Sequence, residues 1–490
     1  MGDYYDLLGL DSKASPEEIR DAYFEIVRFA HPDTNPQPDA TESFLKIQEA
    51  YEVLRDPKKR RAYDRHLPAS ENPEPMLKID VTMSTTRLAR LDEFQLFYAL
   101  VNIECLAKEE QIEAPATHFC FVIDRSTSMK GSRINMVKAN FSRILPKIRS
   151  SDLVSMITFS DRPDLLCASA PKGQIDQLEQ KIDEISCSGG TEIYQGLKAG
   201  VDLLWLKGIQ NPVRHLVLLT DGHTYGDEEA CFELARKAFE QGIVISALGF
   251  GHEWNDAFLD RLTSITGGST LFVTTDEDLY NYLNRQIDSC TKIYAGNLSY
   301  EFISDPGIEV KSVFRLYPEV MPLEKGTSIP LGDLAFGSKS QFLFEYLVPP
   351  LKGGKETVHL SKGGVKMELY GKMVRPARVK LNLKVKTKDT LERESPPREL
   401  VKALGKLTLY QMQEKNSQDV GDGEFRSAVK RMHYLASKML SRGDRELARR
   451  ILMEAEQVNN DHKFTSDGEK HLKYGTRALF LLPEPKSRIS

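Results

Sequence analysis

The chain has 490 residues, of which 40% are hydrophobic and 28% are charged, and its formal net charge is -5. This length and composition predict a soluble protein of about three or four domains, and the acidic balance excludes a chain-wide nucleic-acid-binding surface. No segment approaches the roughly 18 to 20 uninterrupted apolar residues that a membrane helix needs, and no signal peptide opens the sequence. We therefore expect neither a membrane nor nucleic acid among the partners.

Cysteine usage predicts the compartment. The six cysteines are scattered and mostly stand within apolar runs, which is typical of buried thiols in a reducing environment. We therefore expect a cytoplasmic protein. The cysteines are Cys105, Cys120, Cys167, Cys187, Cys231 and Cys290.

Residues 1–66 show the pattern of a small all-α domain. A helix is expected over residues 16–30, because Ser15 is a good N-cap and Glu18 follows at capping-box spacing. A second helix is expected to stop before Asp56-Pro57. Both helices carry an apolar stripe, and two such helices can bury their stripes only against each other. The stripes are Ile19, Tyr23, Ile26 and Val27 or Ala30 in the first helix and Phe44, Ile47, Tyr51 and Leu54 in the second.

The triplet His31-Pro32-Asp33 lies between these two helices. Together with them it resembles the J-domain of DnaJ-type co-chaperones, over residues 3–64. In that family the triplet and the basic face of the preceding helix engage a DnaK-type chaperone and promote its ATP hydrolysis. The resemblance therefore implies a chaperone-binding role for His31, Pro32, Asp33, Arg20 and Arg28.

The helix before the triplet departs from the family in its charge. It carries Asp21 and Glu25 as well as its two arginines, where the family usually presents a lysine- and arginine-rich face. Because charge complementarity mostly sets encounter rate and partner choice, we expect a dedicated chaperone partner or a weak one. The alternative is a J-like fold that no longer stimulates a chaperone. The basic run Lys58-Lys59-Arg60-Arg61 is interpreted as a solvated face.

A proline-rich linker is expected over residues 67–75, and β-strands follow it. Residues 77–83 alternate between apolar and polar side chains, and residues 94–103 are rich in β-forming side chains. The region 76–110 is therefore expected to supply the first strands of a β domain. Because two strands alone make no stable domain, their partners must come from later in the chain.

Three loops with oxygen-bearing side chains mark an α/β domain over residues 115–290. Asp124, Ser126 and Ser128 follow the apolar run 119–123, and the segment 188–192 opens a probable helix. The third loop contains Asp221 and follows the apolar run 216–219. Ligands of doubly wound sheets bind beyond the carboxyl ends of the strands, and oxygen donors there suit Mg2+ or Mn2+. The plainer alternative is that the aspartates cap helices while the hydroxyls satisfy loop backbone.

The order and spacing of these loops resemble the metal-ion-dependent adhesion site of von Willebrand factor A domains, over residues 115–286. The resemblance implies that Ser126, Ser128 and Thr191 ligate the ion through hydroxyls, while Asp124 and Asp221 bind it directly or through water. Because neutral hydroxyls fill much of the shell, the ion stays electrophilic and can accept a carboxylate from a protein partner. The site is expected to bind rather than to catalyse.

The β pattern resumes over residues 291–390. The simplest arrangement is one β-sandwich whose first strands precede the α/β domain and whose other strands follow it. The α/β domain would then be an insertion in the sandwich. This arrangement resembles many bacterial A-domain proteins and the inter-alpha-trypsin inhibitor heavy chains. The alternative is two unrelated β segments flanking an independent A domain. The period then changes to about 3.6 over residues 396–460, which predicts three amphipathic helices. The tail, residues 461–490, receives no predicted structure. The expected strands are 295–302, 307–317, 327–332, 340–348, 357–360 and 379–387.

These patterns leave three functions to weigh. The favoured one is an adaptor co-chaperone, whose A domain grips a partner through its metal while the J-domain recruits and stimulates a DnaK-type ATPase. The second makes the A domain a subunit of a larger assembly with an AAA-type ATPase, remodelled through the J-domain. The third is an enzyme, which we do not expect, because a serine nucleophile needs a positioned base and His223 is the only nearby candidate.

Overall fold

The computed structural model describes residues 4–8, 10, 14–30, 40–66, 75–108, 115–205, 213–222, 226–251, 254–351, 356–370, 375–389, 394–441 and 443–479. The predicted chaperone-binding residues His31, Pro32 and Asp33 lie outside the described residues, as do His223 and the side chain of Arg28. The chain divides into two compact units, one made mainly of residues 1–75 and one made of most of the remainder.

The first unit is a small helical domain, as predicted. Its helices are α1 (Tyr4–Leu7), α2 (Pro16–Ala30), α3 (Ala40–Leu54) and α4 (Pro57–His66). The expected capping box forms, because the Ser15 N–H donates to Glu18 Oε2 at 2.8 Å and the Glu18 N–H donates to Ser15 Oγ at 3.2 Å. Tyr23 of α2 stacks on Tyr51 of α3 with ring centroids 3.8 Å apart. The two predicted stripes therefore meet.

Arg60 departs from the predicted solvated basic face. Its Nε donates to the Tyr5 hydroxyl at 2.7 Å, and its Nη2 donates to the Ala14 carbonyl at 2.7 Å. Lys58, Lys59 and Arg61 are exposed, as expected. Arg60 thus connects α4 to the N-terminal part of the domain. A run of four basic residues does not indicate which side chain packs against the domain.

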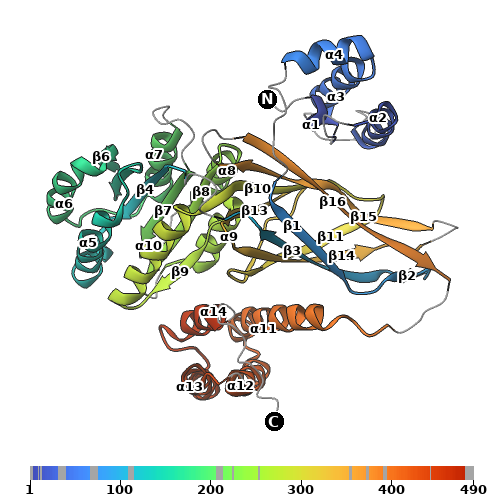
Figure 1. The fold of residues 1–490 in the computed structure, drawn as a ribbon. Helices are drawn as coiled ribbons and strands as arrows, with labels where there is room; N and C mark the ends of the chain where they lie inside the picture. Colours follow the sequence, from blue (N-terminus) through green and yellow to red (C-terminus); the bar gives the residue numbers. More distant parts are fainter. Residues whose placement is uncertain are drawn as a thin grey trace. The chain divides into compact units, whose positions relative to one another are not determined.

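The α/β domain lies in the second unit. Its strands are β4 (Thr117–Asp124), β5 (Leu153–Phe159), β6 (Pro163–Pro171), β7 (Val213–Thr220), β8 (Ile243–Phe250) and β9 (Thr270–Val273). Its helices are α5 (Ser132–Ile144), α6 (Ile175–Asp183), α7 (Ile193–Trp205), α8 (Glu228–Glu240), α9 (Asp256–Thr266) and α10 (Asp276–Cys290). The strands form a sheet in the order β6-β5-β4-β7-β8-β9, parallel except for the edge strand β6 (Figure 1).

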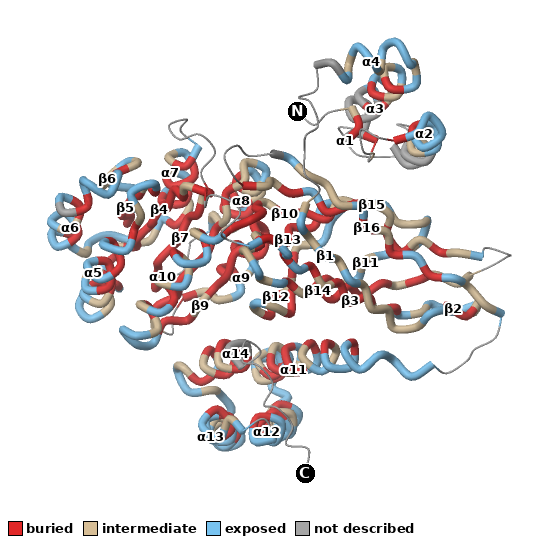
Figure 2. The backbone as a smooth tube through the Cα atoms, in the orientation of Figure 1, coloured by how far each residue is buried: buried red, intermediate tan, exposed pale blue. Residues whose placement is uncertain are grey.

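Helices cover both faces of this sheet. Side chains of α5, α6 and α10 share a core with one face, and those of α7, α8 and α9 share a core with the other. Strands β4, β7 and β8 are therefore buried along almost their whole length, as the red tube of Figure 2 shows. This explains why their sequences are continuous apolar runs.

His215 lies in this core and makes the stability of the domain sensitive to acid. Its Nδ1 lies 3.1 Å from Cys290 Sγ and its Nε2 lies 3.0 Å from Ser246 Oγ. Burial lowers the pKa of His215 from 6.5 to about 4. Between these two pH values the unfolded chain binds a proton that the folded chain does not, so stability is lost as the pH falls through this window.

When the pH falls from neutral to about 5, protonation of His215 in the unfolded chain should lower the free energy of unfolding of wild type by about 2 kcal/mol. His215→Gln should not show this contribution. The measurement is urea unfolding of both proteins at the two pH values. Burial raises the pKa values of Asp124 and Asp333 to about 6, which acts in the opposite direction, but both proteins share these groups. An identical pH dependence in the two proteins would show that the lowered pKa of His215 does not contribute to the acid sensitivity.

The strands before and after the α/β domain form two facing sheets. They are β1 (Leu77–Met83), β2 (Arg87–Ala89), β3 (Gln95–Cys105), β10 (Ile293–Ile303), β11 (Glu309–Tyr317), β12 (Met321–Pro322), β13 (Ser328–Ala335), β14 (Lys339–Val348), β15 (Thr357–Leu369) and β16 (Arg375–Lys388). One sheet has the order β1-β3-β14-β11-β12 and the other β13-β10-β15-β16-β2. Tyr300 of the second sheet meets Phe344 of the first edge to face, with ring centroids 5.7 Å apart. Because β3 pairs with β14, the α/β domain is inserted in a β-sandwich as predicted, and the alternative of two unrelated β segments is wrong.

The C-terminal helices pack on the outer face of the sheet that contains β3, β11 and β14. They are α11 (Arg398–Gly421), α12 (Phe425–Ser441), α13 (Arg445–Asp461) and α14 (Gly468–Leu479). The shared core includes Leu100 and Leu343 from the sheet and Leu400, Met432 and Ile451 from the helices. The predicted region of three helices is present, but the expectation of an unassigned tail after residue 460 is corrected by α14.

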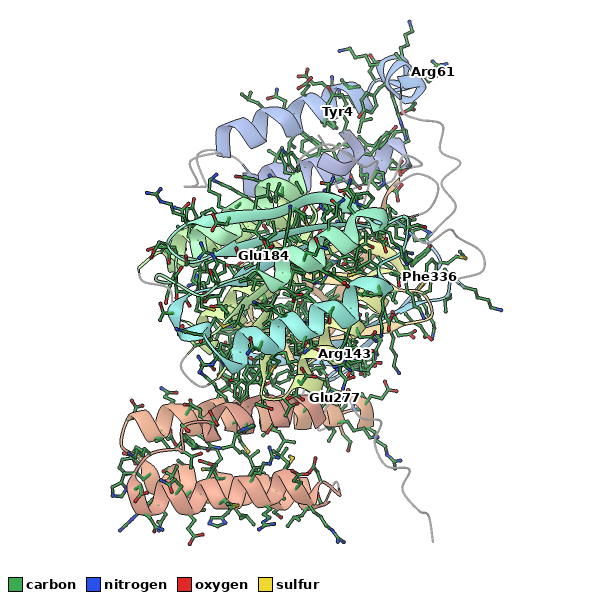
Figure 3. The ribbon with its side chains drawn as sticks, turned by 90° about the vertical axis from the view of Figure 1, so that its left-hand side faces the viewer. Tyr4, Arg61, Arg143, Glu184, Glu277 and Phe336 are labelled. Carbon is green, nitrogen blue, oxygen red and sulfur yellow. The ribbon has the colours of Figure 1, made fainter. Side chains whose placement is uncertain are left out.

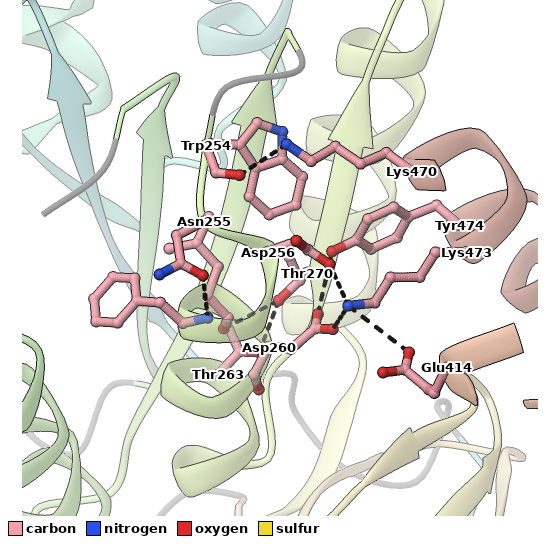
Figure 4. A network of polar contacts seen from close by, with 12 residues as sticks. Trp254, Asn255, Asp256, Asp260, Thr263, Thr270, Glu414, Lys470, Lys473 and Tyr474 are labelled. Atoms are coloured by element: carbon pink, nitrogen blue, oxygen red, sulfur yellow. Dashed lines mark hydrogen bonds and ion pairs between the residues drawn. The ribbon is translucent and has the colours of Figure 1, made fainter. Parts of the chain in front are cut away.

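Helix α14 is anchored to the α/β domain by buried lysines (Figure 4). Lys473 Nζ forms ion pairs with Asp256 and, at 2.9 Å, with Asp260, both on α9. Lys470 Nζ donates to the Trp254 carbonyl at 2.7 Å and lies 4.7 Å from the centre of the Trp254 ring. These lysines are buried, so the inward face of α14 lacks the plain apolar stripe that would have predicted it.

Lys473→Ala is expected to lower the free energy of unfolding by roughly 3 kcal/mol, because it leaves the Asp256 and Asp260 carboxylates together without their cation. The side chains of Lys473 and Asp260 are 7% and 14% exposed, so water screens the pair poorly. Urea denaturation measures the loss. The matched control is Lys198→Ala, whose pair with Asp202 is exposed and should contribute at most about 0.5 kcal/mol. Equal losses in the two variants would refute the anchoring role.

No helix in the described part of the chain is long and apolar enough to cross a membrane. All six cysteines are free thiols, and Cys167 and Cys187 are only partly buried.

Candidate metal centre

The two candidate carboxylates stand at the carboxyl ends of neighbouring parallel strands. Asp124 is the last residue of β4, and Asp221 follows the last residue of β7. The strands pair in register, with Ile123 opposite Leu219, so both acids reach the same edge of the sheet. Their residues are 0% and 1% exposed. A buried pair of acids is costly unless cations or hydrogen-bond donors compensate for it.

Two serine hydroxyls connect these acids. The Ser126 N–H donates to Asp124 Oδ1 at 2.8 Å, and Ser126 Oγ lies 3.0 Å from Ser128 Oγ. Ser128 Oγ in turn donates to Asp221 Oδ1 at 2.8 Å. Oxygens on adjacent vertices of an octahedral Mg2+ site, with bonds of about 2.1 Å, are about 3 Å apart. The two spacings are compatible with neighbouring ligands of such an ion, and they are also ordinary hydrogen-bond lengths.

Thr191 comes from the loop before α7 and lies against the loop after β7. A methyl group at Gly222 would lie 3.1 Å from Thr191 Oγ1, so this side chain lies against the residue that follows Asp221. Gly189 of the Thr191 loop has a φ of +82°, a conformation that favours glycine. Hydrogen bonds thus connect four of the five predicted metal ligands, Asp124, Ser126, Ser128 and Asp221, while Thr191 lies beside Gly222, and their role as metal ligands stays a prediction.

Asp161 holds the Thr191 loop in place, and the sequence analysis did not find it. Its Oδ1 accepts a hydrogen bond from the Gly190 N–H at 2.8 Å, and Thr127 Oγ1 donates to the Gly189 carbonyl at 3.1 Å from the other side. The signal was available in principle, because Asp161 follows β5, which neighbours β4 in the sheet and ends at the same edge. A carboxylate thus stands at or just after the end of each of three adjacent strands, β5, β4 and β7.

Burial controls the electrostatics of the site. It raises the pKa of Asp124 to about 6, against the lowering effect of hydrogen bonds from Thr220 Oγ1 at 2.7 Å and from the Ser126 N–H. A divalent cation beside this carboxylate would stabilise its ionised form. Ser128 is exposed and Thr191 is partly exposed, so the oxygen cluster faces solvent on one side.

The predicted chaperone-binding residues are only partly within the described structure. Arg20 lies on the exposed surface of α2 and pairs with Asp21 at 3.4 Å, with side chains 61% and 66% exposed. An exposed pair between adjacent residues leaves the guanidinium accessible and weakly held.

Three family models match separate parts of the chain. The DnaJ domain matches residues 3–64, the von Willebrand factor type A domain matches residues 119–286, and the Sll0103-like, C-terminal alpha-helical domain matches residues 398–482. The last match includes α14, which the sequence analysis had left in the tail.

Curated relatives match parts of the chain. The uncharacterized protein sll0103 of Synechocystis sp. is 26% identical over 250 residues, which are 49% of this chain and 59% of that protein. The chaperone protein DnaJ of Thermosipho africanus is 55% identical over 65 residues, which are 13% of this chain and 17% of that protein. The chain thus spans less than two thirds of the length of either relative.

Two solved structures share the fold of most of the chain. The von Willebrand factor type A protein from Catenulispora acidiphila aligns with a TM-score of 0.67 at 12% identity, over 84% of this chain and 98% of that one. The ArnB paralog VWA2 from Sulfolobus acidocaldarius aligns with a TM-score of 0.53 at 15% identity, over 83% and 99%. The chain therefore carries an N-terminal DnaJ domain, a von Willebrand factor type A domain set in a β-sandwich, and a C-terminal helical domain of the Sll0103-like type.

Proposed function

We propose that this chain is an adaptor co-chaperone. Its von Willebrand factor type A domain binds a protein partner through a divalent metal, and its DnaJ domain recruits a DnaK-type chaperone to that partner and stimulates its ATPase. The proposal rests on one observation: hydrogen bonds join Asp124, Ser126, Ser128 and Asp221 at one sheet edge, with Thr191 beside Gly222, in a chain that also carries a DnaJ domain.

The metal that suits this set is Mg2+, or Mn2+ in its place. Two carboxylates and three neutral hydroxyls are oxygen donors, and Mg2+ in such a site usually retains water. A bound ion would supply an electrophile that accepts a carboxylate from the partner in exchange for one water. Asp124 and Asp221 would hold the ion, while the exposed side at Ser128 leaves room for the partner.

We propose binding rather than catalysis at this site. The Ser126 and Ser128 hydroxyls contact each other and Asp221, whereas a serine nucleophile needs an oriented base. Ser128 does donate to Asp221 Oδ1, but a carboxylate is a weak base for a serine hydroxyl, and the other oxygen of Asp221 pairs with Arg133. A cytoplasmic location without membrane or nucleic-acid partners is part of the same proposal and rests on the sequence patterns.

The test is affinity capture from a cell lysate with the full chain in magnesium buffer, followed by mass spectrometry of what is retained. Wild type is compared with Asp221→Ala, which removes a metal ligand, and with His31→Gln, which alters the chaperone-binding triplet. The matched controls are Asp202→Ala on α7 and Glu52→Gln on α3, because both side chains are exposed and remote from these motifs.

The proposal predicts that Asp221→Ala loses a specific protein and keeps the DnaK-type chaperone, while His31→Gln shows the reverse. The two control variants should retain both. If the retained set is the same for all five proteins, neither motif mediates capture and the adaptor function is wrong. An AAA-type ATPase as the main metal-dependent partner would favour the alternative of a subunit in a larger assembly.

A further inference from the structure

Arg133 places a fixed positive charge on one of the two metal-site acids. It stands in the first turn of α5, and its Nη1 forms an ion pair with Asp221 Oδ2. The same nitrogen donates to the Ser128 carbonyl at 3.1 Å. The Asp221 side chain is fully buried, and the Arg133 side chain is 25% exposed. A poorly solvated ion pair of this kind interacts strongly.

The backbone opposite is shaped to admit this guanidinium. A methyl group at Gly251, in the loop after β8, would lie 2.5 Å from Arg133 Nη2. Gly251 also has a φ of +70°, which a larger residue rarely adopts. The guanidinium therefore fills a place next to the site that the fold leaves open, in contact with Asp221, Ser128 and the Gly251 loop.

The charges of the site explain what this arginine does. Asp124 and Asp221 contribute two negative charges, and a divalent ion would neutralise both. With Arg133 present, the loaded site carries one more positive charge than it would with a neutral side chain at this position. The arginine thus weakens the attraction of the site for the metal alone and strengthens the attraction of the loaded site for an anion.

We propose that Arg133 makes the metal and an anionic ligand bind cooperatively. The site holds the ion weakly by itself and tightly once a carboxylate offsets the charge of Arg133. Arg133 is in this sense a specificity-determining residue, which selects a carboxylate-bearing partner over a neutral one. This inference rests on the proposed metal-dependent partner binding.

The test is calorimetric titration of the full-length protein with Mn2+ alone and with Mn2+ in the presence of acetate, at constant ionic strength. Arg133→Gln should bind Mn2+ alone about tenfold more tightly than wild type, because one nearby positive charge is gone. Acetate should tighten Mn2+ binding to wild type by a larger factor than it does for Arg133→Gln.

Two further variants separate charge from packing. Arg133→Lys keeps the charge but not the planar guanidinium, and it should bind Mn2+ much as wild type does. Arg143→Gln removes a cation from the same helix, where it pairs with Asp276 at 3.0 Å, and should leave Mn2+ binding unchanged (Figure 3 labels Arg143). A thermal melt of each variant shows whether it is folded. If Arg133→Gln does not fold, the comparison of Arg133→Lys with wild type is used instead.

The outcomes distinguish this inference from the proposed function. If wild type binds Mn2+ but Arg133→Gln binds it equally or more weakly, the role of Arg133 is wrong and the metal site stands. If Arg133→Lys behaves like Arg133→Gln, the shape of the side chain matters rather than its charge, which also overturns the inference. If none of the four proteins binds Mn2+, the metal site itself is wrong and the inference falls with it.

Discussion

Asp221→Ala should weaken Mn2+ and Mg2+ binding by at least about 100-fold, because even residues that only support a metal ligand commonly contribute 10- to 100-fold in affinity. Asp221 is fully buried and accepts the Ser128 hydroxyl at 2.8 Å, so its removal takes away a carboxylate and releases a hydroxyl ligand. It also leaves Arg133 facing the site without its counter-ion. Isothermal titration with Mn2+ measures the loss directly.

The matched control for this prediction is Asp202→Ala. Asp202 lies on the exposed side of α7, where it pairs with Lys198 at 2.9 Å in solvent. The Asp202→Ala substitution removes the same charge from the same domain and should leave the affinity for Mn2+ unchanged. Comparable losses in the two variants would mean that net charge, rather than direct ligation, governs metal binding.

His31→Gln should reduce the stimulation of a DnaK-type ATPase to the basal rate of the chaperone. The DnaJ domain match covers this residue, and the resemblance to DnaJ-type co-chaperones implies that the triplet engages the chaperone. The measurement is single-turnover ATP hydrolysis by the chaperone with wild type or variant added. Because Asp21 and Glu25 dilute the basic charge of the preceding helix, salt should affect the stimulation only modestly.

Glu52→Gln on the exposed face of α3 is the matched control and should stimulate as wild type does. If wild type itself stimulates no DnaK-type chaperone, the J-like fold is inactive and the recruitment step is wrong. If His31→Gln stimulates fully, the triplet does not carry the activity in this chain.

The sequence predicted those features that depend on local pattern or on strand direction. Ser15 and Glu18 form the expected capping box because both partners lie within one turn of the same helix. Asp124 and Asp221 meet because parallel strands that are buried on both faces end at one sheet edge. The strands of the sandwich were predictable from the alternation of apolar and polar side chains. This alternation indicates which face of a strand is buried, but not which strand it pairs with.

Other features depend on tertiary contacts that no local pattern contains. Strand β15 was expected to end at residue 360, but it continues through Ser361 to Leu369. Ser361 is fully buried. Its hydroxyl tolerates burial because the hydroxyls of Tyr300 and Tyr346 lie 2.7 and 3.0 Å from its Oγ and form hydrogen bonds with it. Helix α14 was missed for a similar reason, since buried Lys473 has its partners on α9.

Arg133 was missed because it looks in sequence like an ordinary exposed residue of a helix. Its role depends on the packing of α5 beside Asp221 and on the open place at Gly251, which are more than 80 residues and more than 110 residues away in the sequence. Asp161 likewise gains its role only when β5 takes its place beside β4.

The central claim is that a metal in the von Willebrand factor type A domain holds a protein partner while the DnaJ domain engages a chaperone. The most direct test is to load lysate onto immobilised wild type and Asp221→Ala in magnesium buffer, and to elute each with EDTA. We predict that EDTA releases from wild type a protein that Asp221→Ala never retained, and that both columns hold the DnaK-type chaperone before EDTA is added. Identical EDTA eluates from the two columns would contradict the claim.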